Sequence, residues 1–171
     1  MSVTCRQTLS ISNHRVFVND LNEHETVYGG RLLELLDGSA SISASRLARV
    51  ETVTASIDQL NFIAPFKMQD SLCIESYVSG AGHRSVEIFT KIIGEHLKTG
   101  ERFLGLTAFL TFVTIDKNVV LPSIEPLTAE EKFICQATRN VKRTAWRPSK
   151  PKKSSTRKST LNILGIINFN H

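Results

Sequence analysis

Several features that define common protein classes are missing from this chain of 171 residues. Its three cysteines, Cys5, Cys73 and Cys135, are odd in number, far apart and without a CxxC pair, which argues against a disulfide framework and a zinc knuckle. The first residues lack the apolar run of a signal peptide, and no stretch approaches the roughly 18 apolar residues that span a bilayer. We therefore expect a cytoplasmic protein with no membrane span.

Familiar catalytic signatures are also missing. The sequence contains no GxSxG, no HExxH, no P-loop and no cluster of His, Cys and carboxylate at metal-ligand spacing, so no metal site is indicated. The segment 80–85 (GAGHRS) superficially resembles a nucleotide-binding glycine loop, but its third glycine is missing and a predicted strand follows it. We interpret this segment as a hairpin turn.

Acidic residues are missing from the C-terminal part of the chain. All 16 Asp and Glu residues lie at or before Glu131, whereas 10 of the 21 Lys and Arg residues follow it. The formal charge of +5 therefore divides into −5 (11 basic against 16 acidic residues) up to Glu131 and +10 after it. Because the basic charge belongs to the tail, we do not expect nucleic acid as a partner of the body.

What the chain does contain is one helix followed by a series of strands. In residues 32–48 the apolar positions recur with helical spacing, and the many small residues from Gly38 to Ser45 would let this helix approach a sheet closely. Short breaks separate the expected strands, as in antiparallel neighbours. These strands are near residues 8–18, 51–63, 71–79, 84–96 and 102–115. The order favours an α+β fold with a long central helix wrapped by a curved antiparallel β-sheet of five to six strands.

The last of these strands is apolar on both faces. We expect one face to pack on the helix and the other on a partner chain, which favours an oligomer. Beyond it, Thr128 and Glu131 form a helix-entry signature, and from Arg139 onward the composition is too polar to order itself. The predicted division is a domain over 1–126, a C-terminal helix over 127–143 and a basic, disordered tail over 144–171.

A candidate catalytic group lies on the predicted helix. In helical projection Asp37 falls at the border between the apolar arc and the solvated face, beside Leu33, Ala40 and Ala44. A carboxylate at such a border is partly desolvated, which makes it a better base. From the pattern alone, an exposed, inert aspartate is the commoner case.

Four segments together resemble one known family. They are NDLNEHETVYGGRLLELLD, VTASIDQLNFIAPFKMQDSL, GHRSVEIFTKI and LTAFLTFVTID. Their order and spacing over residues 8–116 resemble the acyl-CoA thioesterases of the hotdog-fold superfamily. The resemblance implies a hotdog domain that pairs into dimers with two active sites across the interface, three dimers often forming a hexamer. It also implies hydrolysis of acyl-CoA to fatty acid and CoA, without metal or organic cofactor.

The same resemblance assigns roles to individual residues. Asp37 matches the essential carboxylate, as general base or as nucleophile, and Asn22 matches an asparagine that assists from the opposing subunit. The helix start at Gly29 and Gly30 would present unpaired N–H groups to the thioester oxygen. The remaining matches are substrate contacts. The residues expected along the acyl channel or the CoA crevice are Thr54, Asn61 and Phe62, and the cations expected near the CoA phosphates are His83, Arg84, Arg139 and Arg143.

Two other functions stay open at this point. One is a non-catalytic hotdog module that binds acyl-CoA as a sensor. The other is hydration or dehydration of acyl-CoA, for which His24 near Asn22 is the candidate histidine. Two positions depart from the family pattern: Glu25 stands where a glycine is usual, and Leu47 where a histidine is usual.

Overall fold

The computed structural model describes residues 2–145, with side chains as far as Thr138. The elements follow in the order β1 (Ser2–Thr4), α1 (Cys5–Thr8), β2 (Ser10–Arg15), η1 (Val18–Asp20), α2 (Gly29–Ala48), β3 (Thr52–Phe62), β4 (Ser71–Ala81), β5 (Ser85–His96), β6 (Glu101–Thr114), β7 (Ser123–Glu125) and α3 (Ala129–Ala145). None of the helices in this part of the chain is long and apolar enough to cross a membrane. The predicted tail beyond α3 lies outside the described residues.

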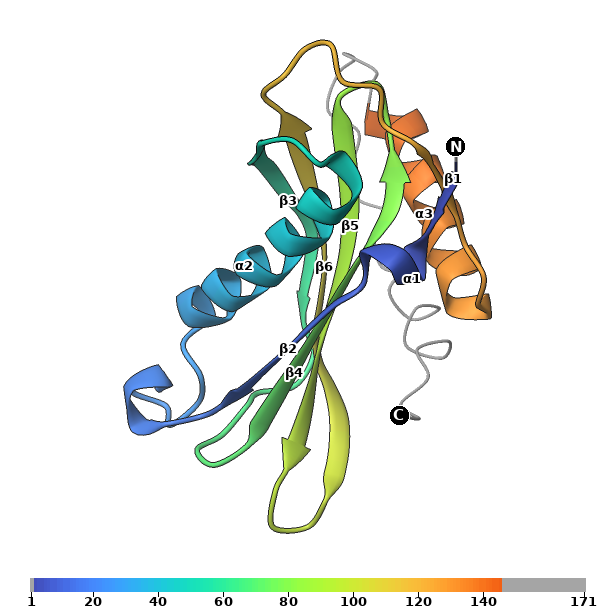
Figure 1. The fold of residues 1–171 in the computed structure, drawn as a ribbon. Helices are drawn as coiled ribbons and strands as arrows, with labels where there is room; N and C mark the ends of the chain where they lie inside the picture. Colours follow the sequence, from blue (N-terminus) through green and yellow to red (C-terminus); the bar gives the residue numbers. More distant parts are fainter. Residues whose placement is uncertain (1, 146–171) are drawn as a thin grey trace.

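One antiparallel sheet of five strands dominates the structure, in the order β2-β4-β5-β6-β3. The long helix α2 lies across one face of this curved sheet, while α1 and α3 lie against the opposite face (Figure 1). A separate parallel pair joins β1 to β7 near the N-terminus. The α+β fold predicted from the sequence, a long helix wrapped by an antiparallel sheet, is confirmed.

Helix α2 approaches the sheet closely because its inner face is made of small side chains. Ala40 and Ala44 are fully buried between larger apolar residues, and the Ser43 hydroxyl donates to the carbonyl of Ser76 on β4 at 2.8 Å. The helix ends at Ala48. The next residue, Arg49, has a left-handed φ of 56°, and its N–H closes the last turn by donating to the carbonyl of Ser45. The middle of α2 therefore lies directly against β4.

The structure corrects one prediction, which concerns what covers the face of the sheet opposite α2. We expected a partner chain to cover the second apolar face of the last strand, but α3 of the same chain covers it, because Phe109 and Leu104 pack with Ile134 in one buried cluster. The start of α3 has the predicted capping box, in which the Thr128 hydroxyl accepts from the N–H of Glu131 and the Glu131 carboxylate accepts from that of Thr128. The hydrophobicity of β6 alone thus does not require an oligomer.

A buried ion-pair cluster fixes α3 to the sheet. Lys91 on β5 is 3% exposed, and its Nζ lies 3.2 Å from a carboxylate oxygen of Glu75 on β4 and 3.0 Å from one of Glu130 on α3. The Tyr77 hydroxyl also donates to Glu130 at 3.3 Å. We refer to these four residues as the Lys91 cluster.

Two cysteines that are distant in sequence meet on the same face. The Sγ atoms of Cys5 on α1 and Cys135 on α3 lie 3.7 Å apart, both buried, and none of the three cysteines forms a disulfide. The hydrogen bond with Cys135 and burial raise the pKa of the Cys5 thiol far above its ordinary value. Cys5 therefore stays protonated at neutral pH.

Two glycines in the sheet make room for aromatic rings. A Cβ built on Gly105 would lie 2.0 Å from the Phe66 ring, and one on Gly94 would lie 2.2 Å from the Phe103 ring. The two rings also contact each other, with centroids 5.6 Å apart. Gly105 thus lets Phe66 lie flat on β6, which fixes the loop between β3 and β4.

Candidate active site

Asp37 lies half-buried near the middle of α2, opposite β3. Its Oδ1 accepts a hydrogen bond of 2.8 Å from the hydroxyl of Thr54 on β3, and its Oδ2 accepts none from the described residues. The structure thus brings together two of the predicted site residues, which stand 17 positions apart in the sequence. One carboxylate oxygen is held by Thr54, and the other is without a hydrogen bond from the described residues.

Asn22 lies in the tight loop between η1 and α2. Its Oδ1 accepts from the backbone N–H groups of His24 at 2.9 Å and Thr26 at 3.2 Å, and from the Thr26 hydroxyl at 3.2 Å. These donors fix the orientation of the amide, so Nδ2 points away from the loop and donates to none of the described residues. Glu25 in the same loop has a φ of 58°, the left-handed region that favours glycine.

The start of α2 is uncapped. Its N-cap residue Tyr28 offers no side-chain hydrogen bond, and the N–H groups of Gly29 and Gly30 have no partner among the described backbone bonds. Such N–H groups carry the positive end of the helix dipole and suit a developing oxyanion. A Cβ on Gly30 would lie 2.5 Å from the Tyr28 ring, so a side chain there would displace that ring.

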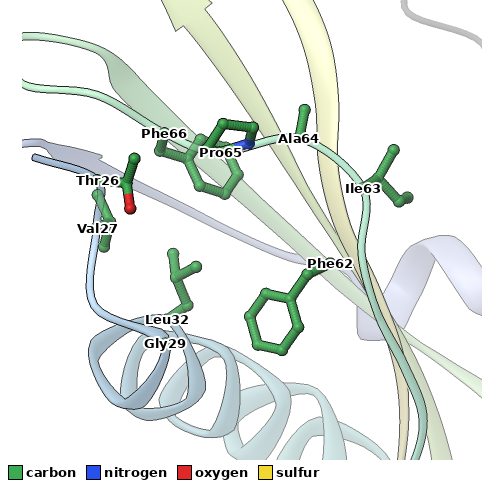
Figure 2. A pocket seen from close by; sticks show the side chains of 9 residues that line it. All are labelled: Thr26, Val27, Gly29, Leu32, Phe62, Ile63, Ala64, Pro65 and Phe66. Atoms are coloured by element: carbon green, nitrogen blue, oxygen red, sulfur yellow. The ribbon is translucent and has the colours of Figure 1, made fainter. Parts of the chain in front are cut away.

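A cavity of about 300 Å³ opens beside this helix start. Figure 2 shows its lining, with Leu32 and Phe62 directed into the same space. The lining residues are mostly apolar: Thr26, Val27, Gly29, Leu32, Phe62, Ile63, Ala64, Pro65 and Phe66. The Phe62 ring lies over Gly29, 3.7 Å from the position a Cβ would take there. The structure therefore brings together the predicted residues Gly29 and Phe62 around an apolar space.

Asp37 and the helix start are too far apart in one chain to act on the same atom. Asp37 stands seven positions after Gly30 along α2, which corresponds to about 10 Å at 1.5 Å per residue. A reacting carbonyl must lie about 3 Å from its oxyanion donors and within reach of the catalytic carboxylate, directly or through one water molecule. Within one chain, Asp37 and the Gly30 N–H group therefore do not both contact one carbonyl directly.

The remaining predicted site residues lie elsewhere. Arg84 lies at the turn before β5, and its Nη2 donates to the carbonyl of Thr114 at 2.6 Å, while its buried Nε has no partner among the described residues. His83 is exposed beside it, and Asn61 donates to the Gln59 carbonyl at 2.6 Å. The side chains of the last two predicted cations, Arg139 and Arg143, lie outside the described ones.

Sequence reasoning missed most of the cavity lining. Pro65 and Phe66 lie in a segment that we interpreted as a break between strands, although a buried phenylalanine within a loop is a signal for a packed, functional loop. It also missed Asp20, a buried carboxylate whose hydrogen bonds hold the Asn22 loop. A single buried acid in a loop leaves no periodic pattern.

A long helix inside a curved antiparallel sheet, with an uncapped start above an apolar cavity and a carboxylate at mid-helix, defines a hotdog-fold enzyme domain. Comparison with known proteins agrees. The Thioesterase superfamily model matches residues 24–101. YkhA of Bacillus subtilis, an uncharacterized acyl-CoA thioester hydrolase, is 48% identical over 130 residues, which cover 74% of this chain and 76% of that protein.

Solved structures give the same result. The acyl-CoA hydrolase of Bacillus cereus superposes with a TM-score of 0.78 at 39% identity, covering 84% of this chain and 88% of that one. That of Staphylococcus aureus, solved with butyryl-CoA, CoA and CoA disulfide, has a TM-score of 0.78 at 30% identity over 85% and 91%. The chain belongs to the acyl-CoA thioester hydrolases, a hotdog-fold family of the thioesterase superfamily.

Proposed function

We propose that this protein hydrolyses acyl-CoA thioesters to a carboxylic acid and CoA, with Asp37 as the catalytic carboxylate. The observation that carries the proposal is the state of the Asp37 carboxylate: the Thr54 hydroxyl holds Oδ1 at 2.8 Å, and Oδ2 accepts no hydrogen bond from the described residues. An oriented carboxylate with one open oxygen can take a proton from water. It can also attack a carbonyl itself.

In the general-base route, Oδ2 takes a proton from a water molecule whose oxygen attacks the thioester carbon. The carbonyl oxygen becomes an oxyanion, which the N–H group of Gly30 stabilises together with the positive end of α2. Collapse of the tetrahedral intermediate breaks the C–S bond, and the CoA thiolate takes a proton as it leaves. In the nucleophilic route, Asp37 forms an anhydride that water then cleaves.

The second half of the site comes from another copy of the chain. Gly30 and Asp37 are about 10 Å apart along α2, so Gly30 and Asn22 of one copy would face Asp37 of its partner. Strand β3 supports such pairing, because it lies at the sheet edge and exposes Val53, Ile57 and Phe62. An acyl-CoA thioesterase of known structure, 32% identical to this chain, is hexameric, and we propose a dimer that assembles further.

The spacing of three residues in the Staphylococcus aureus hydrolase supports the proposed residues. That enzyme has been solved with alanine in place of an asparagine, of an aspartate fifteen positions later and of a threonine seventeen positions after that. Asn22, Asp37 and Thr54 have the same identities and the same two intervals. In our proposal the Asn22 Nδ2 donates to the attacking water or to the thioester oxygen.

The decisive experiment compares Asp37→Asn with wild type. Thiol release from acyl-CoA substrates of two to sixteen acyl carbons measures turnover, and calorimetry measures CoA binding. We expect the variant to lose on the order of 100- to 10,000-fold in kcat. CoA binding and assembly should persist, because the exchange conserves volume.

Glu34→Gln is the matched control, because Glu34 is an exposed carboxylate one turn earlier on the same helix. Its kcat should stay near that of wild type. Turnover of Asp37→Asn within about threefold of wild type would contradict the assignment of the base. If wild type binds acyl-CoA saturably but releases no thiol, the protein is a sensor rather than an enzyme.

A further inference from the structure

Asp20 is a buried carboxylate that touches neither the cavity nor Asp37. It is 6% exposed. Its Oδ2 accepts from the N–H of Phe17 and from Nε2 of His14 on β2, each at 2.9 Å, and its Oδ1 accepts from Nε of Arg31 on α2 at 3.0 Å. One side chain therefore links a strand, a turn and the first turn of the central helix.

These contacts fix both ends of the loop that carries Asn22. The carbonyl of Asp20 accepts from the N–H of Tyr28 at 2.8 Å, which closes the loop, and Leu21 pairs with Val27 just inside it. Asn22 stands next to Leu21 in this closed loop. Any shift of Asp20 relative to α2 therefore moves the Asn22 amide relative to the helix start.

We propose that Asp20 is a positioning residue for the reaction, holding the Asn22 amide and the N-terminus of α2 in one rigid arrangement through its hydrogen bonds to His14, Phe17 and Arg31. The inference rests on the proposed role of Asn22. Asp20 does not contact the substrate. It affects the rate because it fixes the Asn22 amide, a donor that must be placed to within a few tenths of an ångström of its position in the reaction.

The electrostatics of the group fit this role. Burial acts to raise the pKa of Asp20, but the hydrogen bonds from Phe17, His14 and Arg31 together lower it below its ordinary value. Asp20 therefore stays ionised at neutral pH and holds its donors with charge-assisted bonds. An asparagine at this position would have one accepting oxygen instead of two. Its NH2 group would face the donor of Arg31, or those of Phe17 and His14, and could accept no hydrogen bond from them.

Asp20→Asn tests the inference by separating kcat from KM. We expect kcat to fall by about tenfold to a hundredfold, since small displacements of a catalytic donor cost rates of that order. KM should stay within about threefold, because the variant leaves the substrate contacts in place.

Glu75→Gln serves as the matched control. Glu75 is equally buried at 6% and also ion-paired, but it lies in the Lys91 cluster on the opposite face of the sheet. It should lower thermal stability without lowering kcat. A kcat loss in Glu75→Gln equal to that in Asp20→Asn would reduce the effect to general destabilisation and overturn the proposal.

A double-mutant cycle with Asn22→Ala shows whether Asp20 acts through Asn22. Once Asn22 is removed, Asp20→Asn should lower kcat by no more than about twofold, because coupled residues are not additive. Two outcomes would overturn the role of Asp20 but leave the proposed role of Asn22 intact. One is that the kcat losses of the two single variants add fully in the double variant. The other is that Asp20→Asn keeps the wild-type kcat while Asn22→Ala is impaired. Wild-type kcat in Asn22→Ala refutes the proposed role of Asn22 and the inference with it.

Arg31→Met provides the same test if Asp20→Asn fails to fold. The Arg31 side chain is about a third exposed, so its loss removes the link from Asp20 to α2 with little cost in stability. We expect a severalfold fall in kcat that disappears in the Asn22→Ala background. Unchanged kcat in Arg31→Met shows that the link to α2 does not matter and overturns the proposal.

Discussion

Replacing Lys91 with methionine should destabilise the protein by about 3 kcal/mol, the lower end of the range for breaking a buried ion pair. In the native cluster the Lys91 ammonium lies 3.0 Å from Glu130 and 3.2 Å from Glu75. At an effective dielectric constant near 20, each attraction is worth about 5 kcal/mol, most of which desolvation of the three ions offsets. Methionine preserves the apolar stem but leaves two carboxylates facing each other with no cation between them.

Thermal and urea unfolding at one fixed protein concentration measure this effect, since assembly links stability to concentration. A loss of about 3 kcal/mol corresponds to a Tm lower by roughly 6–12 °C for a domain of this size. Glu130→Gln is the control, because Lys91 then keeps Glu75 and the loss should be about 1 kcal/mol. If Lys91→Met unfolds like Glu130→Gln, the reasoning about uncompensated charge is wrong.

Three further predictions concern single side chains. Gly105→Ala should cost several degrees of Tm, because its Cβ would lie 2.0 Å from the Phe66 ring; an unchanged Tm would show that the ring moves freely. Burial and the Glu130 carboxylate raise the pKa of Tyr77, so the fold should lose stability as pH rises above the unfolded value near 10, which unfolding at pH 8 and 11 measures. The raised pKa of the Cys5 thiol predicts that iodoacetamide at pH 8 labels this residue in guanidinium but not in the native protein, as peptide mass spectrometry can show.

Elements with a periodic pattern were predictable. The helix and each strand of the main sheet occupy nearly the expected residues, because the apolar side chains of the helix recur with helical spacing and turn residues separate the strands. The capping box of Thr128 and Glu131 was predictable for a similar reason, since both partners lie within one helical turn. The short parallel pair of β1 and β7 carries no such signal.

Contacts between distant segments were not predictable. The apolar pattern of β6 shows that both faces are covered but not by what, and here α3 takes the place we assigned to a partner chain. Cys5 and Cys135 stand 130 positions apart, so their contact depends on how both terminal helices pack. In the site, the resemblance supplied Asp37 and Asn22, whereas the hydrogen bonds of Asp20 emerge only from the fold.

The position of α3 bears on how the chain can be shortened. The match to the thioesterase superfamily model ends at residue 101, where β6 begins. Strand β6, however, joins β3 to the rest of the sheet, and α3 covers the face of the sheet opposite α2. A fragment of residues 24–101 would lack β6, so the edge strand β3 would have no neighbour in the sheet. A fragment ending at residue 126 would lack α3 and expose the rings of Phe89 and Phe109. Expression fragments of this enzyme should therefore be designed around the covered sheet rather than around the matched sequence.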